Sequence, residues 1–284
     1  MGRQEEKKVV KKIYNDQEAK RALMMEQSII LETPRLTPRQ FERYSSLVYR
    51  QCGIHLTRDK EALLNARIAK RLRTLGVQAD QYYRIISKNA EELSRFVDAV
   101  STNHTFFFRE AQSFRVLQPE CRRIWCAASS TGEEPYSIAA HCYDQGYQPS
   151  IFATDISESC LHKARTGVYP LQSAKHIPER ILRKCFQKGK DQWNGYMRVK
   201  PEIMRMVHFR RFNLIKDAAP EDMFDTIFCR NVMIYFDNRT KEKVLEMLCS
   251  RLQPKGHFII GGAESLNNLE HRLAYIEPSV YQKK

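Results

Sequence analysis

Apolar positions recur along this chain with two different periods. Between residues 39 and 100 they return every three or four positions, which predicts a series of amphipathic helices. From residue 123 onwards, apolar runs of strand length alternate with helical patterns, and this alternation predicts a mostly parallel sheet flanked by helices. The expected architecture is a small all-helical part followed by a larger α/β part.

The most informative stretch of the α/β part runs from Arg123 to Ala140 and reads RIWCAASSTGEEPYSIAA. Its apolar start has the length of a buried strand, small and hydroxyl residues lead to Gly132, and Pro135 opens a helical pattern. Proline suits the first turn of a helix, where its missing N–H costs nothing. A strand, a small-residue turn and a helix N-terminus predict the first half of a nucleotide-binding βαβ unit.

The turn carries two carboxylates, Glu133 and Glu134. A pyrophosphate bound at a helix N-terminus would require more glycines and bare N–H groups. Carboxylates instead suit ribose hydroxyls or a cationic ligand, and S-adenosylmethionine offers both, with a sulfonium, an ammonium and no phosphate. The alternative is that the two carboxylates only interact with the helix dipole, and the local sequence leaves both interpretations open.

Polar residues also follow other predicted strands. Asp155 ends the run 151–154, at the distance of about 20 residues past the glycine where such folds place an acid for ribose hydroxyls. The alternative is that Asp155 or Ser157 caps the next helix. Asn213 and Asn231 follow later strands, and parallel strands bring such residues to one edge of the sheet. This convergence predicts a ligand site at the carboxyl ends of the strands.

The segment after the second strand interrupts the α/β alternation. FQK at 186–188 and YMRVK at 196–200 flank a turn and predict two antiparallel strands, with a helical lead-in over Pro178–Cys185. We therefore expect a small β-rich insertion at about 166–208. The remaining expected elements are strands at Val207–Phe209, Phe224–Cys229 and His257–Ile260 and a helix over Lys241–Leu252.

The stretch Ser101–Ala111 reads STNHTFFFREA and joins the helical part to the α/β part. Three consecutive aromatic side chains point in different directions, so we expect the phenylalanines at 106–108 to wedge between the two domains. Arg109 beside them would be partly desolvated and would need an anionic partner. The alternative is a surface pair of Arg109 with Glu110 on a packed corner.

The helical part contains one stretch with two distinct faces, LLNARIAKRLRTLG at 63–76. Leucine and isoleucine recur on one side, basic residues run along the other, and Gly76 is a C-cap signal. The basic residues are Arg67, Lys70, Arg71 and Arg73. They form either a solvated face or a ridge that docks an acidic partner.

Composition narrows the function classes. No run approaches the ~20 apolar residues of a membrane span, and the charged N-terminus lacks the apolar core of a signal peptide. We therefore expect a cytoplasmic protein without direct membrane insertion. The eight cysteines show no C-x-x-C pair, which favours a reducing compartment and no metal site. A net charge of +14 favours an acidic partner, such as nucleic acid, an anionic membrane or a protein surface.

Several stretches, which recur in order with compatible spacing, resemble the CheR-type chemotaxis receptor methyltransferases. That family transfers a methyl group from S-adenosylmethionine to receptor glutamates. The matching stretches are NHTFFFRE (103–110), AASSTGEEPYSIA (127–139), FATDIS (152–157), NL (213–214), FDTIFCRNVMIYF (224–236) and LQPKGHFIIGGAESL (252–266). The resemblance covers residues 37 to 281. It implies an α/β fold, a Rossmann-like class I methyltransferase domain with an N-terminal all-helical domain and a small inserted antiparallel β-subdomain.

The resemblance also implies site residues and partners. By position, contacts with S-adenosyl-L-methionine fall on Asn103, Thr105, Arg109, Glu134, Asp155, Asn213, Leu214, Asn231 and Val232. The basic helix corresponds to the surface that meets the acidic coiled-coil domain of a chemoreceptor. The β-subdomain of some members grips a receptor C-terminal peptide. We expect a monomer that binds no nucleic acid.

These expectations divide the chain into four segments. They are an N-terminal extension of uncertain order (1–33), a helical receptor-docking domain (34–100), a linker that contributes to the site (101–112) and an S-adenosylmethionine-binding catalytic domain (113–284).

The expected catalytic residues are Arg109 and Tyr235. A receptor glutamate is already ionised at neutral pH, because its unperturbed pKa is ~4.3, and it needs no general base. The protein must then align and desolvate it. Arg109 is the candidate for orienting this carboxylate. Tyr235 either hydrogen-bonds the substrate or is a packed aromatic of the apolar MIYF run.

Two other functions are open alternatives. The positive charge suits a nucleic-acid methyltransferase, but methylation of an exocyclic base nitrogen usually brings an acid or Asn, two prolines and an aromatic after the fourth strand. This chain reads RNVM at 230–233, which argues against that function. A non-catalytic S-adenosylmethionine-binding adaptor would keep the fold without turnover, and the set of arginine, acids and asparagines disfavours it.

Overall fold

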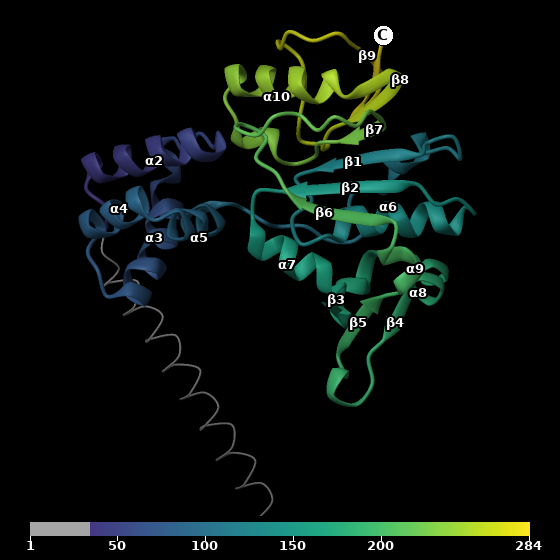
Figure 1. Ribbon diagram of the computed structural model, residues 1–284, viewed down its shortest axis with the longest axis horizontal. Coiled ribbons are helices and arrows are strands. Elements are labelled where there is room, and N and C mark those ends of the chain that lie inside the picture. The colour runs from purple at the N-terminus through teal and green to yellow at the C-terminus, as the bar shows by residue number, and fades with distance from the viewer. Residues whose placement is uncertain (1–34) are drawn as a thin grey trace, which may run out of the picture.

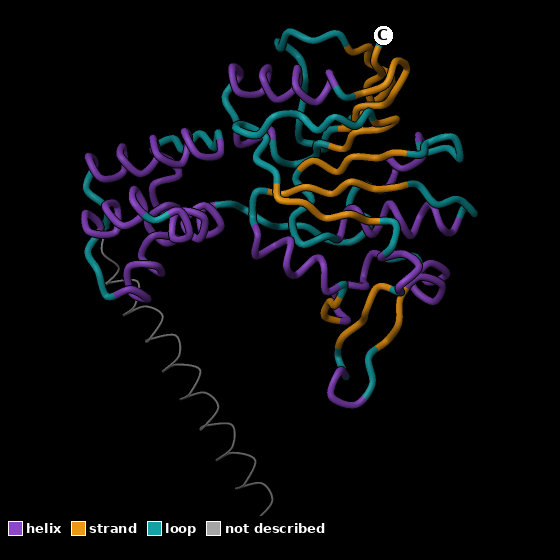
Figure 2. Tube along the Cα trace, viewed as in Figure 1, coloured by secondary structure: helices purple, strands orange, loops and turns teal. Residues whose placement is uncertain are grey.

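The computed structural model describes residues 35–284. The expected N-terminal extension (1–33) lies outside the described residues. The described chain forms a helical bundle, a large mixed sheet covered by helices and a small antiparallel sheet (Figures 1 and 2). No helix in this part of the chain combines the length and apolarity that crossing a bilayer requires.

The bundle forms from the segment with helical periodicity. Its helices are α2 (Pro38–Cys52), α3 (Glu61–Leu75), α4 (Ala79–Lys88) and α5 (Ala90–Val100). Thr37 caps α2 in a capping box and Pro38 occupies its first turn, as the Thr-Pro pair predicts. The apolar faces meet in a core of their own, in which the rings of Tyr44, Tyr82 and Phe96 contact one another. The prediction of an all-helical part is confirmed.

The large sheet has seven strands in the order β6-β2-β1-β7-β8-β10-β9. Their bounds are β1 (Arg123–Ala127), β2 (Ser150–Asp155), β6 (Val207–Arg211), β7 (Phe224–Phe228), β8 (Leu252–Ile259), β9 (Leu273–Glu277) and β10 (Val280–Lys283). The first five strands in this order pair in parallel, whereas β10 pairs antiparallel with β8 and β9. The mostly parallel sheet is confirmed, and the C-terminal hairpin β9–β10 is an addition that the apolar pattern did not predict.

Helices cover both faces of this sheet. Side chains of β1 alternate between two cores, with Ile124 in one and Trp125 in the other. The first core holds the buried side of α6 (Glu133–Asp144), and the second holds that of α10 (Asn238–Ser250). The helix α7 (Glu158–Thr166) contacts β2 and β6. The α/β part is therefore a three-layer structure.

The small sheet lies between α7 and β6 in the sequence and projects from the large sheet in Figure 1. Its strands β3 (Val168–Pro170), β5 (Tyr196–Val199) and β4 (Phe186–Lys188) pair antiparallel in that order. The helices α8 (Glu179–Cys185) and α9 (Pro201–Met204) accompany them. The predicted antiparallel pair and its helical lead-in are confirmed, while the exact division of the chain into domains stays a prediction.

The expected position of the three phenylalanines was wrong. Phe107 and Phe108 are buried in the same core as α6. The ring centroid of Phe107 lies 4.9 Å from that of Tyr169 and 5.3 Å from that of Phe186, both on the small sheet. These aromatics therefore attach the linker to the α/β part, because that core buries the rings of Phe107 and Phe108 almost completely.

Candidate active site

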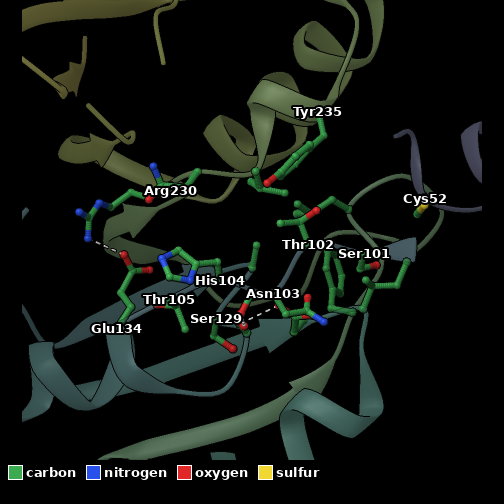
Figure 3. Close-up of a pocket in the computed structure, with 18 of the residues that line it drawn as sticks. Cys52, Ser101, Thr102, Asn103, His104, Thr105, Ser129, Glu134, Arg230 and Tyr235 are labelled. Carbon is green, nitrogen blue, oxygen red and sulfur yellow. Dashed lines mark hydrogen bonds and ion pairs between the residues drawn. The ribbon is translucent and has the colours of Figure 1, made fainter. Parts of the chain in front are cut away.

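One pocket lies where the carboxyl ends of β1, β2, β6 and β7 meet the end of α2 (Figure 3). It encloses about 990 Å³ of space, part of which is open to solvent. The residues that the sequence placed at the cofactor and catalytic site all line it. They are Asn103, Thr105, Arg109, Glu134, Asp155, Asn213, Leu214, Asn231, Val232 and Tyr235. The structure brings these side chains together, and the role of each one stays a prediction.

The loop between β1 and α6 has an unusual backbone. Ala128 and Ser130 have φ angles of 81° and 47°, and Gly132 has a φ of 93°. A Cβ at Gly132 would lie 2.8 Å from the Cβ of Ala164 and 2.9 Å from the hydroxyl of Tyr169. Glycine is therefore required for close packing against α7. Residues held in such conformations cluster at functional sites, where the surrounding structure maintains them.

Asp155 is buried at the end of β2 and is held by backbone donors. Its Oδ2 accepts the N–H of Ser130 at 2.7 Å, and its Oδ1 accepts the N–H of Ser157 at 2.9 Å. Burial raises the pKa of Asp155, although these N–H groups act in the opposite direction. Ser157, not Asp155, caps α7, because its hydroxyl accepts the N–H of Cys160. The carboxylate of Asp155 keeps acceptor capacity for a ligand in the pocket.

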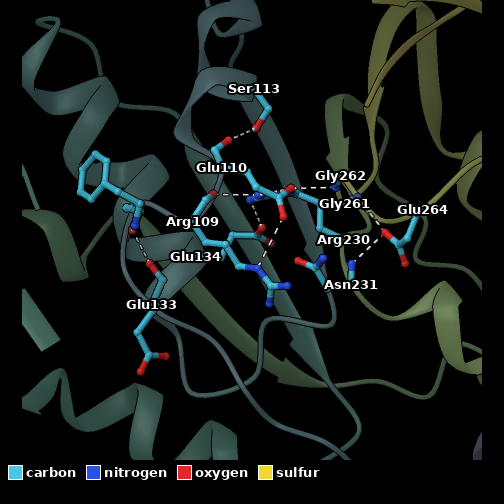
Figure 4. Close-up of polar contacts among 12 residues, drawn as sticks. Arg109, Glu110, Ser113, Glu133, Glu134, Arg230, Asn231, Gly261, Gly262 and Glu264 are labelled. Atoms are coloured by element: carbon cyan, nitrogen blue, oxygen red, sulfur yellow. Dashed lines mark hydrogen bonds and ion pairs between the residues drawn. The ribbon is translucent and has the colours of Figure 1, made fainter. Parts of the chain in front are cut away.

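Arg230 lies at the centre of a buried charge network that the sequence did not reveal (Figure 4). Its side chain is 1% exposed. Nη1 donates to Oε1 of Glu134 at 2.6 Å, and Nη2 donates to Oε2 of Glu110 at 3.1 Å and to the carbonyl of Arg109 at 2.7 Å. Burial alone would lower the pKa of this guanidinium, but the two carboxylates outweigh burial and raise it.

This network determines which carboxylate oxygen of Glu134 is available to a ligand. Burial raises the pKa of Glu134, and the charge of Arg230 opposes that effect. Oε1 of Glu134 is committed to Arg230, whereas no residue in the range 35–284 donates to Oε2. Glu134 therefore has one carboxylate oxygen that can accept from a ligand, while Arg230 bridges Glu134 to a second carboxylate, that of Glu110.

Arg109 is held at the pocket by weaker contacts. Its side chain is 26% exposed, and Nε lies 3.6 Å from Glu110. Nη1 donates to the carbonyl of His104 at 3.3 Å, and the guanidinium lies 5.7 Å from the ring centroid of Phe106. Burial acts to raise the pKa of Glu110, but the N–H of Gly262 and the charge of Arg230 hold it below its usual value. The partial desolvation of Arg109 is confirmed, and its guanidinium remains accessible to a ligand.

The wall that follows β7 is fixed by one carboxylate, that of Glu264. Its Oε2 accepts the N–H groups of Asn231 at 2.8 Å and Gly261 at 2.7 Å. Its Oε1 accepts those of Val232 at 3.0 Å and Met233 at 2.8 Å. Burial raises the pKa of Glu264, and these donors oppose the rise. The backbone that presents Asn231 and Val232 to the pocket is thereby held in one conformation.

The end of α2 closes another side of the pocket. Nδ2 of Asn213 donates to the carbonyl of Gln51 at 2.7 Å, and the N–H of His55 donates to the carbonyl of Tyr235 at 2.8 Å. Two residues of this segment line the pocket, Cys52 and Ile54. The helical bundle is therefore part of the site. The side chain of Tyr235 is half-buried among apolar residues, so its packing and catalytic roles both stay open.

Sequence reasoning missed several residues of the site. Arg230 lies two residues after the end of β7, and Glu264 lies shortly after β8, so the rule that selected Asn231 at a strand end could have found both. The hydroxyl of Ser129 is buried with no hydrogen-bond partner among the described residues, and Ser129 lines the pocket. His104 also lines the pocket and is exposed. No sequence signal beyond position in the linker marked it.

The basic face of α3 needs one correction. Arg67, Lys70 and Arg73 are exposed and form no ion pair with another residue that the structure describes. Arg71 points inward and donates to both carboxylate oxygens of Glu92 at 2.7 Å. It lies three positions after a buried residue of the apolar stripe, where helical residues share a face, and the buried Glu92 requires a counter-charge. Arg71 is therefore not part of the exposed basic face.

The charges around the pocket indicate which ligands fit. The charged lining consists of two carboxylates and two guanidiniums, those of Glu134, Asp155, Arg109 and Arg230. This set suits a ligand that carries both a cationic and an anionic group together with hydroxyls. Within residues 35–284, no group of histidine, cysteine and acidic side chains is arranged to hold a metal ion.

Comparisons with known proteins agree with this geometry. The chain matches the family described as CheR methyltransferase, all-alpha domain, over residues 39–101, and CheR methyltransferase, SAM binding domain, over residues 103–281. The chemotaxis protein methyltransferase of Salmonella typhimurium is 38% identical over 262 residues, which cover 87% of this chain and 90% of that protein. The Escherichia coli protein of the same name is 37% identical over 260 residues (87% and 91%). Chemotaxis protein methyltransferase 2 of Pseudomonas aeruginosa is 36% identical over 260 residues (86% and 93%).

Among solved structures, a glycopeptide N-methyltransferase complexed with sinefungin aligns with a TM-score of 0.37 at 13% identity, over 55% of this chain and 50% of that one. That likeness is too weak to carry a conclusion. The family matches, the relatives and the arrangement of strand ends around one pocket agree, and the chain belongs to the CheR methyltransferase family, with an S-adenosylmethionine-binding domain.

Proposed function

We propose that this protein transfers the methyl group of S-adenosyl-L-methionine to glutamate side-chain carboxylates of chemotaxis receptors, with S-adenosyl-L-homocysteine as the second product. One observation carries the proposal. A single pocket combines acidic and amide side chains at the strand ends with an accessible arginine, Arg109. Relatives that share more than a third of their residues with this chain are named chemotaxis protein methyltransferases, which supports the receptor as the substrate.

The residues of the pocket fit the cofactor. Bound S-adenosylmethionine supplies a methyl group on a sulfonium and also carries an ammonium, a carboxylate and ribose hydroxyls. Asp155 would hold the hydroxyls, because its carboxylate is buried, anchored by backbone donors and still able to accept. Oε2 of Glu134 would accept from the ammonium. The unpaired hydroxyl of Ser129 and the amide of Asn231 are further polar groups that the ligand would satisfy, whereas the amide of Asn213 already bonds Gln51 and Ile215.

Arg109 would then orient the substrate carboxylate. A guanidinium pairs with a carboxylate through two parallel N–H groups and so fixes its direction. The substrate glutamate arrives ionised at neutral pH, so no side chain of this protein has to remove a proton. The contribution of the protein is to align the reacting groups and exclude water. Tyr235 lines the same pocket and either bonds the substrate or only packs the wall.

The exposed face of α3 would dock the receptor. Arg67, Lys70 and Arg73 present three cations on adjacent turns, which complement an acidic coiled coil. The small sheet carries a second exposed feature, Trp193 and Tyr196 at its tip, where a receptor C-terminal peptide would bind. A cytoplasmic monomer that binds neither nucleic acid nor the bilayer directly is part of the same proposal, since receptor methylation requires only these contacts.

A methylation assay separates this function from its rivals. The protein is incubated with methyl-labelled S-adenosylmethionine and either a chemoreceptor cytoplasmic fragment or nucleic acid, and base-labile label is counted, because methyl esters hydrolyse in base. Base-labile label on the receptor fragment alone supports the proposal, and Arg109→Ala should lose most of it while remaining folded. Base-stable label on nucleic acid would identify a nucleic-acid methyltransferase. Cofactor binding without any label transfer would identify an adaptor.

A further inference from the structure

A cluster of cation-forming side chains surrounds Phe106 beside the pocket. The guanidinium of Arg109 lies 5.7 Å from the ring centroid of Phe106. The imidazole of His104 lies 6.2 Å from that centroid, and the imidazole of His176 lies 5.1 Å from it. His104 lines the pocket in Figure 3, and His176 ends the helical turn Leu171–His176, which follows β3 within the insertion. Two separate segments thus meet at one ring.

Neither imidazole has a hydrogen-bonding role in the described part of the fold. Both histidines are exposed, and neither ring makes a hydrogen bond or an ion pair with another of the described residues. A packing role alone would not require two imidazoles, which can carry charge and donate hydrogen bonds. Both rings pack near Phe106, and their nitrogens have no partner among the described residues.

We propose that His104 and His176, which lie around Phe106 beside Arg109, form a rim that binds a second carboxylate of the polypeptide substrate, next to the glutamate that Arg109 orients. The inference rests on the proposed function, because it needs an acidic polypeptide at the pocket mouth. Protonation of an imidazole adds a positive charge, so substrate binding should strengthen as the pH is lowered.

The other charges near the rim are consistent with this direction. Arg109 is a permanent cation, and Lys175 precedes His176 in the sequence. The acidic groups near His104 are Glu133, which is buried and accepts from the hydroxyl of Thr131, and Glu134, which is paired with Arg230. Both carboxylates are engaged by other groups, so neither forms an ion pair with His104. A substrate carboxylate would therefore provide the missing partner.

The test compares the pH dependence of KM with that of kcat. The receptor fragment is methylated between pH 6 and 8 by the wild type, by His104→Asn, by His176→Asn and by the double variant. An exposed ion pair contributes 0.2–1 kcal/mol, so KM of the wild type should fall roughly two- to fivefold per histidine toward pH 6. In the double variant, KM should no longer fall toward pH 6, and this change should appear in KM and not in kcat. His208→Asn, an exposed histidine on β6, is the matched control.

A second substrate sharpens the test. A receptor fragment whose acids beside the methylated glutamate are replaced by glutamine should show no histidine-dependent slope with the wild-type enzyme. Calorimetry of S-adenosylmethionine binding checks that each variant is folded, and His104→Gln replaces His104→Asn if that variant is not. Ester formation with an unchanged KM slope in the double variant overturns the rim. Absence of ester at every pH overturns the proposed function instead.

Discussion

Two buried arginine–glutamate pairs lie in different regions of this protein and have different consequences. In the bundle, Arg71 binds both carboxylate oxygens of Glu92, and the hydroxyl of Tyr82 donates to Oε1 at 2.9 Å. In the pocket, Arg230 binds one oxygen of Glu134, Oε1, together with Glu110 and the carbonyl of Arg109, but its Nε has no partner within the described chain, and Oε2 of Glu134 has no donor there. The first pair is saturated and the second is not.

The difference shows that the number of unsatisfied polar atoms in a buried ion pair indicates whether the pair stabilises the fold or belongs to a binding site. A buried ion pair with every polar atom satisfied holds a fold in one arrangement without binding anything further. A pair that keeps unused donors and acceptors beside a cavity costs stability until a ligand supplies the missing partners. By this criterion the pair in the bundle is structural and the pair in the pocket is part of a binding site.

The largest effect is expected for Arg230→Met. The substitution keeps most of the volume but leaves the largely buried Glu134 without its counter-charge and removes the guanidinium that Glu110 contacts, and breaking a buried pair costs about 3–5 kcal/mol. Urea unfolding should show this loss, and methyl transfer should be abolished even where the protein is folded. Glu134→Gln in the same background is the control, because removing the stranded charge should recover part of the stability but not the activity. Full activity of Arg230→Met would show that this pair is structural after all.

A smaller effect on ligand binding is expected for Asp155→Asn. Hydrogen bonds to a charged group contribute about 1.5–3 kcal/mol, so the affinity for S-adenosylmethionine should fall roughly 10- to 100-fold, as calorimetry would measure. In the wild type, burial raises the pKa of Asp155, and the ligand hydroxyls require the ionised form. Affinity should therefore fall as the pH drops through that raised pKa, beginning at a higher pH than for an ordinary aspartate.

The sign of the stability effect separates this loss of affinity from unfolding. A carboxyl group whose folded-state pKa exceeds its unfolded-state pKa stabilises the fold as the pH falls through that interval. Asp155 itself therefore does not drive acid unfolding in the range where binding weakens. Asp155→Asn should show a flatter affinity profile over the same range, and an unchanged profile would remove Asp155 from the cofactor site.

The smallest effect is expected for Arg71→Met, and it should appear in stability alone. The substitution removes the guanidinium that binds both oxygens of the buried Glu92 and leaves it the hydroxyl of Tyr82 and the guanidinium of Arg95 at 3.7 Å, so we expect a loss of about 1–3 kcal/mol. The midpoint of thermal unfolding should fall, while KM for the receptor and kcat remain at wild-type values below that midpoint. Lys70→Met is the matched control on the same helix, with a raised KM and unchanged stability. A raised KM for Arg71→Met would return this arginine to the docking face.

Local chemistry made much of the fold predictable. The Thr37-Pro38 cap, the turn at Gly132 and the acid at the end of β2 are signals carried by neighbouring residues, and each occurs where the sequence indicates. The hairpin β9–β10 was missed because its outer strand is an exposed edge. Tyr275 and Ile276 are 62% and 50% exposed, so no inside–outside alternation marks it.

The charge network was less predictable because it depends on tertiary contacts. Arg230 looks like the polar end of a strand, and only the fold shows that Glu110, 120 positions earlier in the chain, lies against it. The orientation of Arg71 was available in principle, since Leu64, Ile68 and Leu72 form a buried stripe and residue 71 lies on the same side of the helix. The charge of residue 71 favours the exposed face of the helix, whereas helical periodicity correctly predicts that it lies beside the buried stripe.

The hydrogen bonds from the end of α2 to Asn213 and Tyr235 make the pocket a structure of two pieces. The proposed docking of a receptor helix on the bundle and the proposed methyl-donor site among the strand ends would be connected through one short segment, residues 51 to 55. Thermodynamic linkage then requires reciprocity. If receptor docking raises the affinity for S-adenosylmethionine by some factor, bound S-adenosylmethionine must raise the affinity for the receptor by the same factor. With positive coupling of this kind, the residence time of the enzyme on its receptor would be longest while the methyl donor is bound.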